Sequence, residues 1–263
     1  MLNLKIKDKD ENILFSESGK SIVCEYNNVY NEGDKIVIEL EDCEYIKIKI
    51  EESLAESIVY VPGKLFEYSI PFGEKRVAFK EDAWTKDKNV ITVSEATDDE
   101  VYSYRNIALN STAKRYEERF FPYAKANYVT RDEAWFEERN SIDGCIYQDG
   151  HGPYPFQSYA GGAREDIEYY LYFGKKAEID KIVFYLRADF QDDHDTYWKS
   201  LSVELSDGTK IPANFVKSNK GQTLVLDKKY ITDSIHLTDF KQASDPLSWA
   251  ALTQIEVFGK LIK

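Results

Sequence analysis

Apolar and polar residues alternate with a period of two along most of the first 95 residues. The alternation is clearest in the runs KIVIEL, YIKIKI, SIVYVPG, LFEYSIPF and KRVAFKEDAW, and Gly or Pro residues lie between or inside them. Such alternation, rich in Ile, Val and aromatic residues, is typical of antiparallel strands with one face in water. Short strands that follow one another this closely predict a small β-sandwich or jelly roll.

The pattern is interrupted twice before it resumes. The acidic stretch ATDDE predicts an exposed connector, so we place a boundary near residues 94–100 and predict one domain over residues 1–95 and a second over residues 96–263. Between Ala113 and Asn140, charged and aromatic residues mix without clean alternation. A short helix is predicted over residues 131–138, with the Thr130 side chain capping its first turn.

Past Ile142 the two-residue period returns. It continues through EYYLYF, EIDKIVFYLR, KSLSVELSDGTKI, QTLVLDKKYI, SIHLTDF and ALTQIEVFG. The SDGT step at residues 206–209 predicts a hairpin turn, because Asp-Gly tolerates the positive φ that tight turns need. We therefore expect an all-β protein made of two β-sandwich (jelly-roll) domains.

The amino-acid composition indicates a folded, acidic β protein. Hydrophobic residues make up 43% of the 263 residues and aromatic residues 14%, and 19 residues are Tyr, which suits half-buried strands and hydrated faces. The net charge is −13, and both predicted domains are acidic: residues 1–95 hold 13 Lys/Arg against 20 Asp/Glu, and residues 96–263 hold 21 against 27. Without a basic region we expect neither nucleic acid nor a membrane as partner.

The location of the protein is predicted from its first residues and its cysteines. The start, MLNLKIKDKDEN, lacks the apolar segment of a signal peptide, and no apolar run is long enough to span a bilayer. Cys24, Cys43 and Cys145 are odd in number and far apart, so they form no disulfide framework. We expect a cytoplasmic protein, although a secreted protein whose leader had been removed would look the same.

Six short motifs follow one another over roughly the last 160 residues. They are NIALNS at residues 106–111, RNSIDG at 139–144, the paired runs EYYLYF and EIDKIVFYLR, the hairpin VELSDGT and the final ALTQIEVFG. In this order they resemble the discoidin domain, also called the coagulation-factor C-type or galactose-binding-like domain, whose bacterial sugar-binding branch includes the family-32 carbohydrate-binding modules. The resemblance implies, for residues 96–263, a jelly-roll sandwich with its binding loops gathered at one end.

The resemblance also implies a set of ligand-binding residues. Galactose-binding members carry a histidine in the loop after the D-G turn, which is His151 here, and an arginine at the end of the following strand, which is Arg187. A polar residue follows, Asp192 here where the family often has Asn, and an aromatic residue of a late loop, here Trp249, stacks on the sugar. The further residues expected to line the same cleft are Tyr154, His194 and Trp198.

Elementary chemistry supports this residue set for a sugar. A planar guanidinium donates two parallel hydrogen bonds to adjacent hydroxyls, an imidazole adds one more donor or acceptor, and an indole covers a C–H face. Each contact contributes roughly 1 kcal/mol before the cost of association, so affinities on the order of micromolar to millimolar are expected for a monosaccharide.

Each of these residues also has a plainer interpretation. Arg187 could form a surface ion pair, His151 could be a solvated loop tip between glycines, and Trp249 could plug the end of the sandwich. The cluster DFQDDHDTYW at residues 189–198 lacks the Asp-x-Asp-x-Asp-Gly order of a calcium loop and is better explained as a solvated acidic loop.

A structural calcium is a further expectation that the resemblance raises. Many family members hold calcium near the D-G turn, where Asp143 lies here, with a carboxylate from the closing strand. That second position is Gln254 here, and Glu256 lies two residues on, on the same face of the strand. The lost charge weakens the case for calcium, which stays an open expectation.

We therefore expect non-catalytic carbohydrate binding by the C-terminal domain, with galactose-type sugars as ligands. A protein–protein interaction or structural module, including a homo-oligomer, remains an alternative, because one fold serves several functions. A glycan-active hydrolase that uses the same cleft is a second alternative. The sequence has no HExxH, GxSxG, P-loop or dinucleotide-binding motif, but a pair of catalytic carboxylates is set by spacing in three dimensions.

Overall fold

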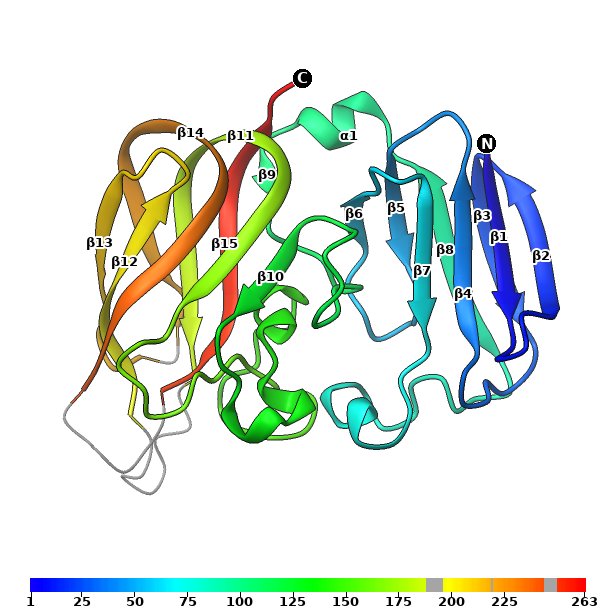
Figure 1. Ribbon diagram of the computed structural model, residues 1–263, viewed down its shortest axis with the longest axis horizontal. Coiled ribbons are helices and arrows are strands. Elements are labelled where there is room, and N and C mark those ends of the chain that lie inside the picture. Colours follow the sequence, from blue (N-terminus) through cyan, green and yellow to red (C-terminus); the bar gives the residue numbers. More distant parts are fainter. Residues whose placement is uncertain (188–195, 219, 244–249) are drawn as a thin grey trace.

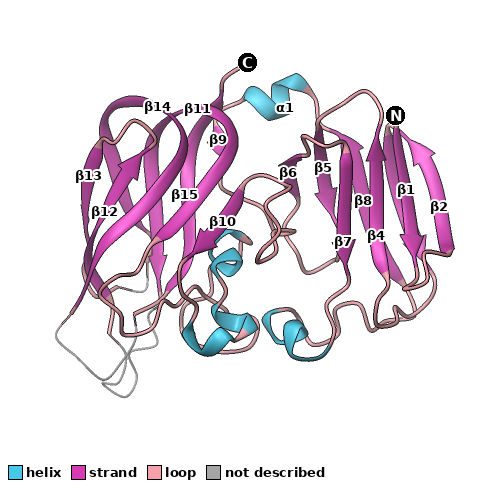
Figure 2. Cartoon of the chain, viewed as in Figure 1, coloured by secondary structure: helices cyan, strands magenta, loops and turns pink. Residues whose placement is uncertain are grey.

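The computed structural model describes residues 1–187, 196–218, 220–243 and 250–263. The chain is built almost entirely of antiparallel strands, which confirms the predicted all-β class. Figure 1 shows two bodies of strands side by side, one formed by N-terminal and the other by C-terminal residues. In Figure 2 most of the short helical turns gather at one end of the molecule, where the two bodies face each other.

The N-terminal part consists of two four-stranded antiparallel sheets packed on each other. Their orders are β2-β1-β4-β7 and β3-β8-β5-β6. The strands are β1 (Leu2–Lys7), β2 (Ile13–Gly19), β3 (Ser21–Tyr26), β4 (Lys35–Leu40), β5 (Tyr45–Lys49), β6 (Ser57–Tyr60), β7 (Leu65–Ser69) and β8 (Asn89–Glu95).

Period-two alternation is the physical reason for these strands. In β1 every second residue, Leu2, Leu4 and Ile6, is fully buried between the two sheets. The run KRVAFKEDAW was expected to be a strand, and this expectation is wrong. It contributes the end of a 3-10 turn, η1 (Gly73–Ala78), and then further turns. Its buried residues come in adjacent pairs, such as Ala83 with Trp84, and adjacent residues cannot share one face of a strand.

The C-terminal part is dominated by a seven-stranded antiparallel sheet. Its order is β13-β12-β14-β11-β15-β9, and β10 pairs with β11 in addition. The strands are β9 (Arg105–Asn106), β10 (Tyr123–Ala126), β11 (Tyr169–Leu186), β12 (Trp198–Leu205), β13 (Lys210–Asn214), β14 (Gln222–Gln242) and β15 (Leu252–Leu261). The predicted SDGT hairpin joins β12 to β13, with Gly208 at φ +85°.

Two predicted elements of this part differ from the structure. The helix expected over residues 131–138 is replaced by three 3-10 turns, η2 (Thr130–Asp132), η3 (Ala134–Phe136) and η4 (Glu138–Ile142). Arg131 and Asp132 have positive φ, which interrupts a helix, and the Thr130 hydroxyl donates to the Ala160 carbonyl instead of capping. The connector at ATDDE is exposed at residues 97–99 as predicted, but helix α1 (Asp98–Tyr102), capped by Thr97 and Glu100, begins within it.

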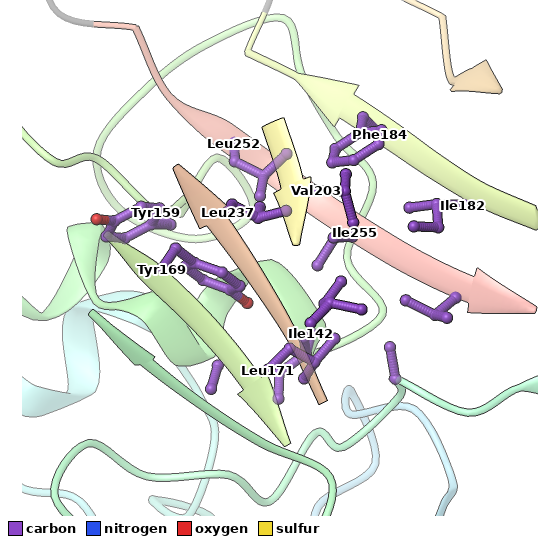
Figure 3. Close-up of a cluster of buried hydrophobic side chains, with 14 of the residues drawn as sticks. Ile142, Tyr159, Tyr169, Leu171, Ile182, Phe184, Val203, Leu237, Leu252 and Ile255 are labelled. Carbon is purple, nitrogen blue, oxygen red and sulfur yellow. The ribbon is translucent and has the colours of Figure 1, made fainter. Parts of the chain in front are cut away.

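A single hydrophobic cluster fills the C-terminal part. Figure 3 shows Tyr159, Leu252, Leu237 and Val203 in this cluster. Tyr159 lies in the loop before β11, and Leu252 is the first residue of β15. Both side chains are buried in this cluster, so the core holds the chain at these two places. Among the described residues, no helix is both long and apolar enough to cross a bilayer.

The two parts are joined by packing and by hydrogen bonds. Phe120 inserts into the N-terminal core, with its ring centroid 4.8 Å from that of Phe66. The backbones of Tyr60 in β6 and Phe121 exchange hydrogen bonds of 2.9 and 3.0 Å.

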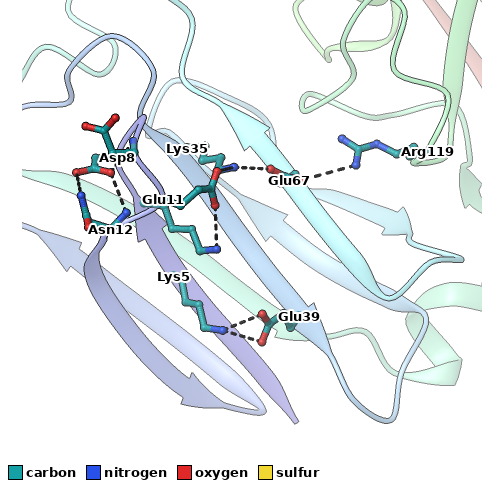
Figure 4. Close-up of polar contacts among 10 residues, drawn as sticks. Lys5, Asp8, Glu11, Asn12, Lys35, Glu39, Glu67 and Arg119 are labelled. Atoms are coloured by element: carbon teal, nitrogen blue, oxygen red, sulfur yellow. Dashed lines mark hydrogen bonds and ion pairs between the residues drawn. The ribbon is translucent and has the colours of Figure 1, made fainter.

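A charged network on β4 and β7 reaches the same junction. Figure 4 shows Lys35, Glu11, Glu67 and Arg119 in this network. Lys35 pairs with Glu11 and Glu67, and Arg119 lies 3.6 Å from the other oxygen of Glu67. Because Arg119 comes from the C-terminal part, these contacts couple the two cores. The division into domains at residue 95 stays a prediction.

Candidate functional site

The first residues of β15 organise one end of the C-terminal sheet, which we name the β15 end. The backbones of Tyr159 and Leu252 exchange hydrogen bonds of 2.7 and 2.8 Å. The Arg187 backbone N–H donates to the Ala251 carbonyl at 3.1 Å. The strand end that carries Arg187 is therefore fixed next to the start of β15.

The loop that carries His151 contacts the first residues of β15 at both of its ends. At its start the Gly144 N–H donates to Gln254 Oε1 in β15 at 3.2 Å, and at its end the chain reaches the pair of Tyr159 with Leu252. The His151 side chain is exposed. Gly150, beside it, lies on the Phe156 ring, which a Cβ at residue 150 would approach to 2.9 Å.

Arg187 and His151 differ in exposure. Arg187 is only 5% exposed and follows directly on β11, in which Phe184 and Leu186 point into the core. A guanidinium held by packing keeps one orientation, which favours bidentate hydrogen bonding. His151 stands at a loop tip, where a ligand can reach it without rearrangement of the core.

The other predicted ligand residues fall into three groups. Asp192, His194 and Trp249 lie outside the described residues. Tyr154 is half-buried and lines a cleft beside Tyr147. Trp198 was expected to line a surface cleft, and this expectation is wrong, because its side chain is 0% exposed.

The surroundings of Trp198 explain this burial. Its ring lies 4.7 Å from that of Phe240 and 6.3 Å from that of Tyr159, measured between centroids. An indole packed in this way has no face to offer a ligand, so Trp198 is a core residue here.

The residues around Asp143 suit hydrogen bonds better than calcium. Its two carboxylate oxygens accept from the Cys145 N–H at 2.7 Å and from Gln157 Nε2 at 2.8 Å. Burial raises the pKa of Asp143 to about 6, and these two hydrogen bonds oppose the rise. Calcium takes six to eight oxygen ligands, whereas Gln254 Oε1 is already an acceptor for Gly144.

In the described ranges, no cluster of three or more His, Cys, Asp or Glu side chains is arranged to hold a metal ion. Calcium at the D-G turn stays a prediction.

Tyr147, Gln157 and Lys49 were not predicted as site residues, yet all three line the cleft that Tyr154 lines. The cleft has a volume of about 490 Å³ and lies where the loop of residues 144–157 meets the N-terminal part. The aromatic content of YQDGHGPYPF was a visible signal for Tyr147. Lys49 belongs to another sheet, and only the fold brings it here.

Comparison with known proteins gives structural matches only. No protein-family model matches the chain, and no curated protein matches it in sequence. Solved structures with a similar fold include chitosan-binding module 1 of a chitosanase/glucanase from Paenibacillus sp. IK-5. This match has 14% identity and a TM-score of 0.41, and it covers 59% of this chain and 99% of that chain.

Two further matches are of the same kind. The family 32 carbohydrate-binding module of C. perfringens NanJ, solved in complex with galactose, has 13% identity and a TM-score of 0.39, covering 51% of this chain and 91% of that one. A fucose-binding module from Streptococcus pneumoniae has 14% identity and a TM-score of 0.39, covering 58% and 96%.

Proposed function

We propose that this protein binds carbohydrate without altering it, at the β15 end, and that its ligands are galactose-type sugars. One observation carries the proposal: the loop with His151 and the strand end with Arg187 are both tied to the first residues of β15. We propose that the buried guanidinium of Arg187 and the exposed imidazole of His151 act on the same ligand. Asp192, His194 and Trp249 are proposed to complete the site.

The chemistry of the two described groups suits a sugar. Arg187 would donate to two neighbouring hydroxyls, and His151 would contribute a single donor or acceptor to a third. Hydrogen bonds of this kind contribute roughly 1 kcal/mol each, so we expect dissociation constants on the order of micromolar to millimolar.

The test is calorimetric titration of the intact chain with a panel of monosaccharides that includes galactose, fucose and glucose. We expect His151→Ala and Arg187→Lys each to weaken galactose binding about fivefold to tenfold. Arg187→Lys keeps the charge and loses the fork of donors, so it separates geometry from charge.

Arg119→Ala is the matched control, because this guanidinium lies at the junction of the two parts and pairs with Glu117 and Glu67. The affinity of the Arg119→Ala variant for galactose should equal that of the wild type. Absence of binding to every sugar, or full affinity in both site variants, would refute the proposal.

A further inference from the structure

A cleft of about 490 Å³ lies between the N-terminal part and the loop of residues 144–157, and its walls are tied together at both sides. At one side Gly144, with φ +88°, touches Ala55 so closely that an added Cβ would lie 2.9 Å from the Ala55 Cβ. At the other side the Tyr154 N–H donates to the Val77 carbonyl at 2.9 Å. These two contacts hold the walls of the cleft together. Neither Arg187 nor His151 lines it.

Aromatic and amide groups occupy the wall that the C-terminal part supplies. Tyr147 is 62% exposed, and Tyr154 is half-buried beside it. Gln157 is 2% exposed and is held by its Nε2, which donates to Asp143. Its Oε1 accepts no hydrogen bond from the described part of the chain. This oxygen is thus a buried, unsatisfied acceptor on a residue that lines the cleft together with Tyr147 and Tyr154. Phenol rings and an acceptor without a partner suit a ligand with hydroxyl groups and C–H faces.

The wall from the N-terminal part supplies a positive charge. Lys49, at the end of β5, is half-buried in this wall and has no ion pair within the described ranges. The acidic side chains that line the cleft are already engaged: Glu52 pairs with Lys86 at 3.0 Å, and Asp143 accepts its two hydrogen bonds. In a chain of net charge −13, Lys49 is thus available to an anionic group.

We propose that this cleft is a second binding site, separate from the β15 end, and that it takes an acidic sugar. The sugar ring packs against Tyr147 and Tyr154, a hydroxyl donates to Gln157 Oε1, and the sugar carboxylate pairs with Lys49. The cleft volume falls within the roughly 300–1,000 Å³ range of small-molecule sites, which accommodates a disaccharide. One ammonium, without a second cation among the lining residues, suits a single carboxylate better than a polyphosphate.

This site would give the N-terminal part a role in recognition. Residues of the two parts line it together, so the ligand would bind where the two cores meet. Binding would then depend on the intact chain.

The test is titration of the intact chain with digalacturonic acid and with the matching neutral galactose disaccharide. We expect the wild type to bind the acidic disaccharide at least fivefold more tightly than the neutral one in low salt, and added salt to reduce the difference. Lys49→Gln should weaken binding of the acidic disaccharide about tenfold and leave the neutral one unchanged. Tyr147→Ala should weaken both.

Two controls separate this site from the β15 end and from general charge effects. Lys20→Gln removes an exposed lysine of the same part of the chain and should not change binding of the acidic disaccharide. Arg187→Lys weakens the β15 end, where both disaccharides can also bind, and should leave the loss caused by Lys49→Gln as large as in the wild type. Equal affinity for both disaccharides, unchanged binding in Lys49→Gln, disappearance of the Lys49→Gln effect in the Arg187→Lys background, or no binding at all would each overturn the proposal.

Discussion

Single residues show most clearly where prediction from the sequence ends. Trp198 was expected beside the ligand because it follows an acidic loop, but β12 buries it with Leu201, Val203 and Leu205. Strict alternation from Leu201 would put Trp198 on the opposite face. Register irregularities between Trp198 and Ser202 change the phase of the strand, and no residue pattern announces them.

Glu138 offers a residue-scale prediction about pH. Burial raises its pKa to about 7, although Arg115 lies 3.7 Å away and opposes the rise. The unfolded chain has a pKa near 4.3 at this residue. Between these values the folded state binds more protons than the unfolded state, so the free energy of unfolding should fall as pH rises from about 4.5 to about 7.

Glu138→Gln should remove this fall. The loss of stability between pH 4.5 and pH 8 should be smaller in the variant than in the wild type, by up to about 3 kcal/mol. Urea unfolding at the two pH values measures it, with the exposed Glu118→Gln as control. An identical pH dependence in wild type and Glu138→Gln would show that Glu138 does not titrate in this way.

At the scale of elements, the sequence predicted strands well and their limits poorly. EYYLYF and EIDKIVFYLR were expected as two consecutive strands, the first of which a glycine ends. They form one strand instead, β11, whose pairing with β14 is irregular between Tyr172 and Ala177. Gly174 lies in this interval with φ +76°. The helix α1 carried a visible signal that the sequence interpretation overlooked, since Thr97 and Glu100 have the spacing of a capping box.

Gly174 gives the element-scale prediction. A Cβ there would lie 2.5 Å from Phe121 Cγ, so Gly174→Ala combines a strained backbone with a steric clash. We expect a loss of about 3 kcal/mol or more in the free energy of unfolding.

Gly208→Ala is the matched variant for this experiment. Gly208 has φ +85° with nothing within 4 Å of an added Cβ, so it carries the backbone cost alone, about 1 kcal/mol. Denaturant unfolding of both variants measures the difference, and equal losses would mean that Phe121 moves aside without cost.

At the scale of the whole molecule, the sequence predicted two sandwiches but not how they meet. Phe120 and Phe121 are adjacent, yet Phe120 enters the N-terminal core while Phe121 pairs with β6. Local sequence patterns do not predict such contacts, because each contact depends on residues far apart in the chain. The cleft with Lys49, Tyr147 and Gln157 was invisible for the same reason.

The insertion of Phe120 predicts coupled unfolding. We expect the wild type to unfold in a single calorimetric transition, and Phe120→Ala to lose about 3 kcal/mol and to split the transition in two. Phe136→Ala is the control, because Phe136 is equally buried but belongs to the C-terminal core. Two separate transitions in the wild type would show that the cores are not coupled.

Sugar binding at the β15 end is tested most directly by amide chemical shifts. The isotopically labelled chain is titrated with galactose while backbone amide signals are followed. We predict shifts that saturate with one common dissociation constant and cluster in residues 150–152, Arg187 and residues 250–252. Absence of saturable shifts, or shifts confined to surfaces away from these residues, would contradict the central claim.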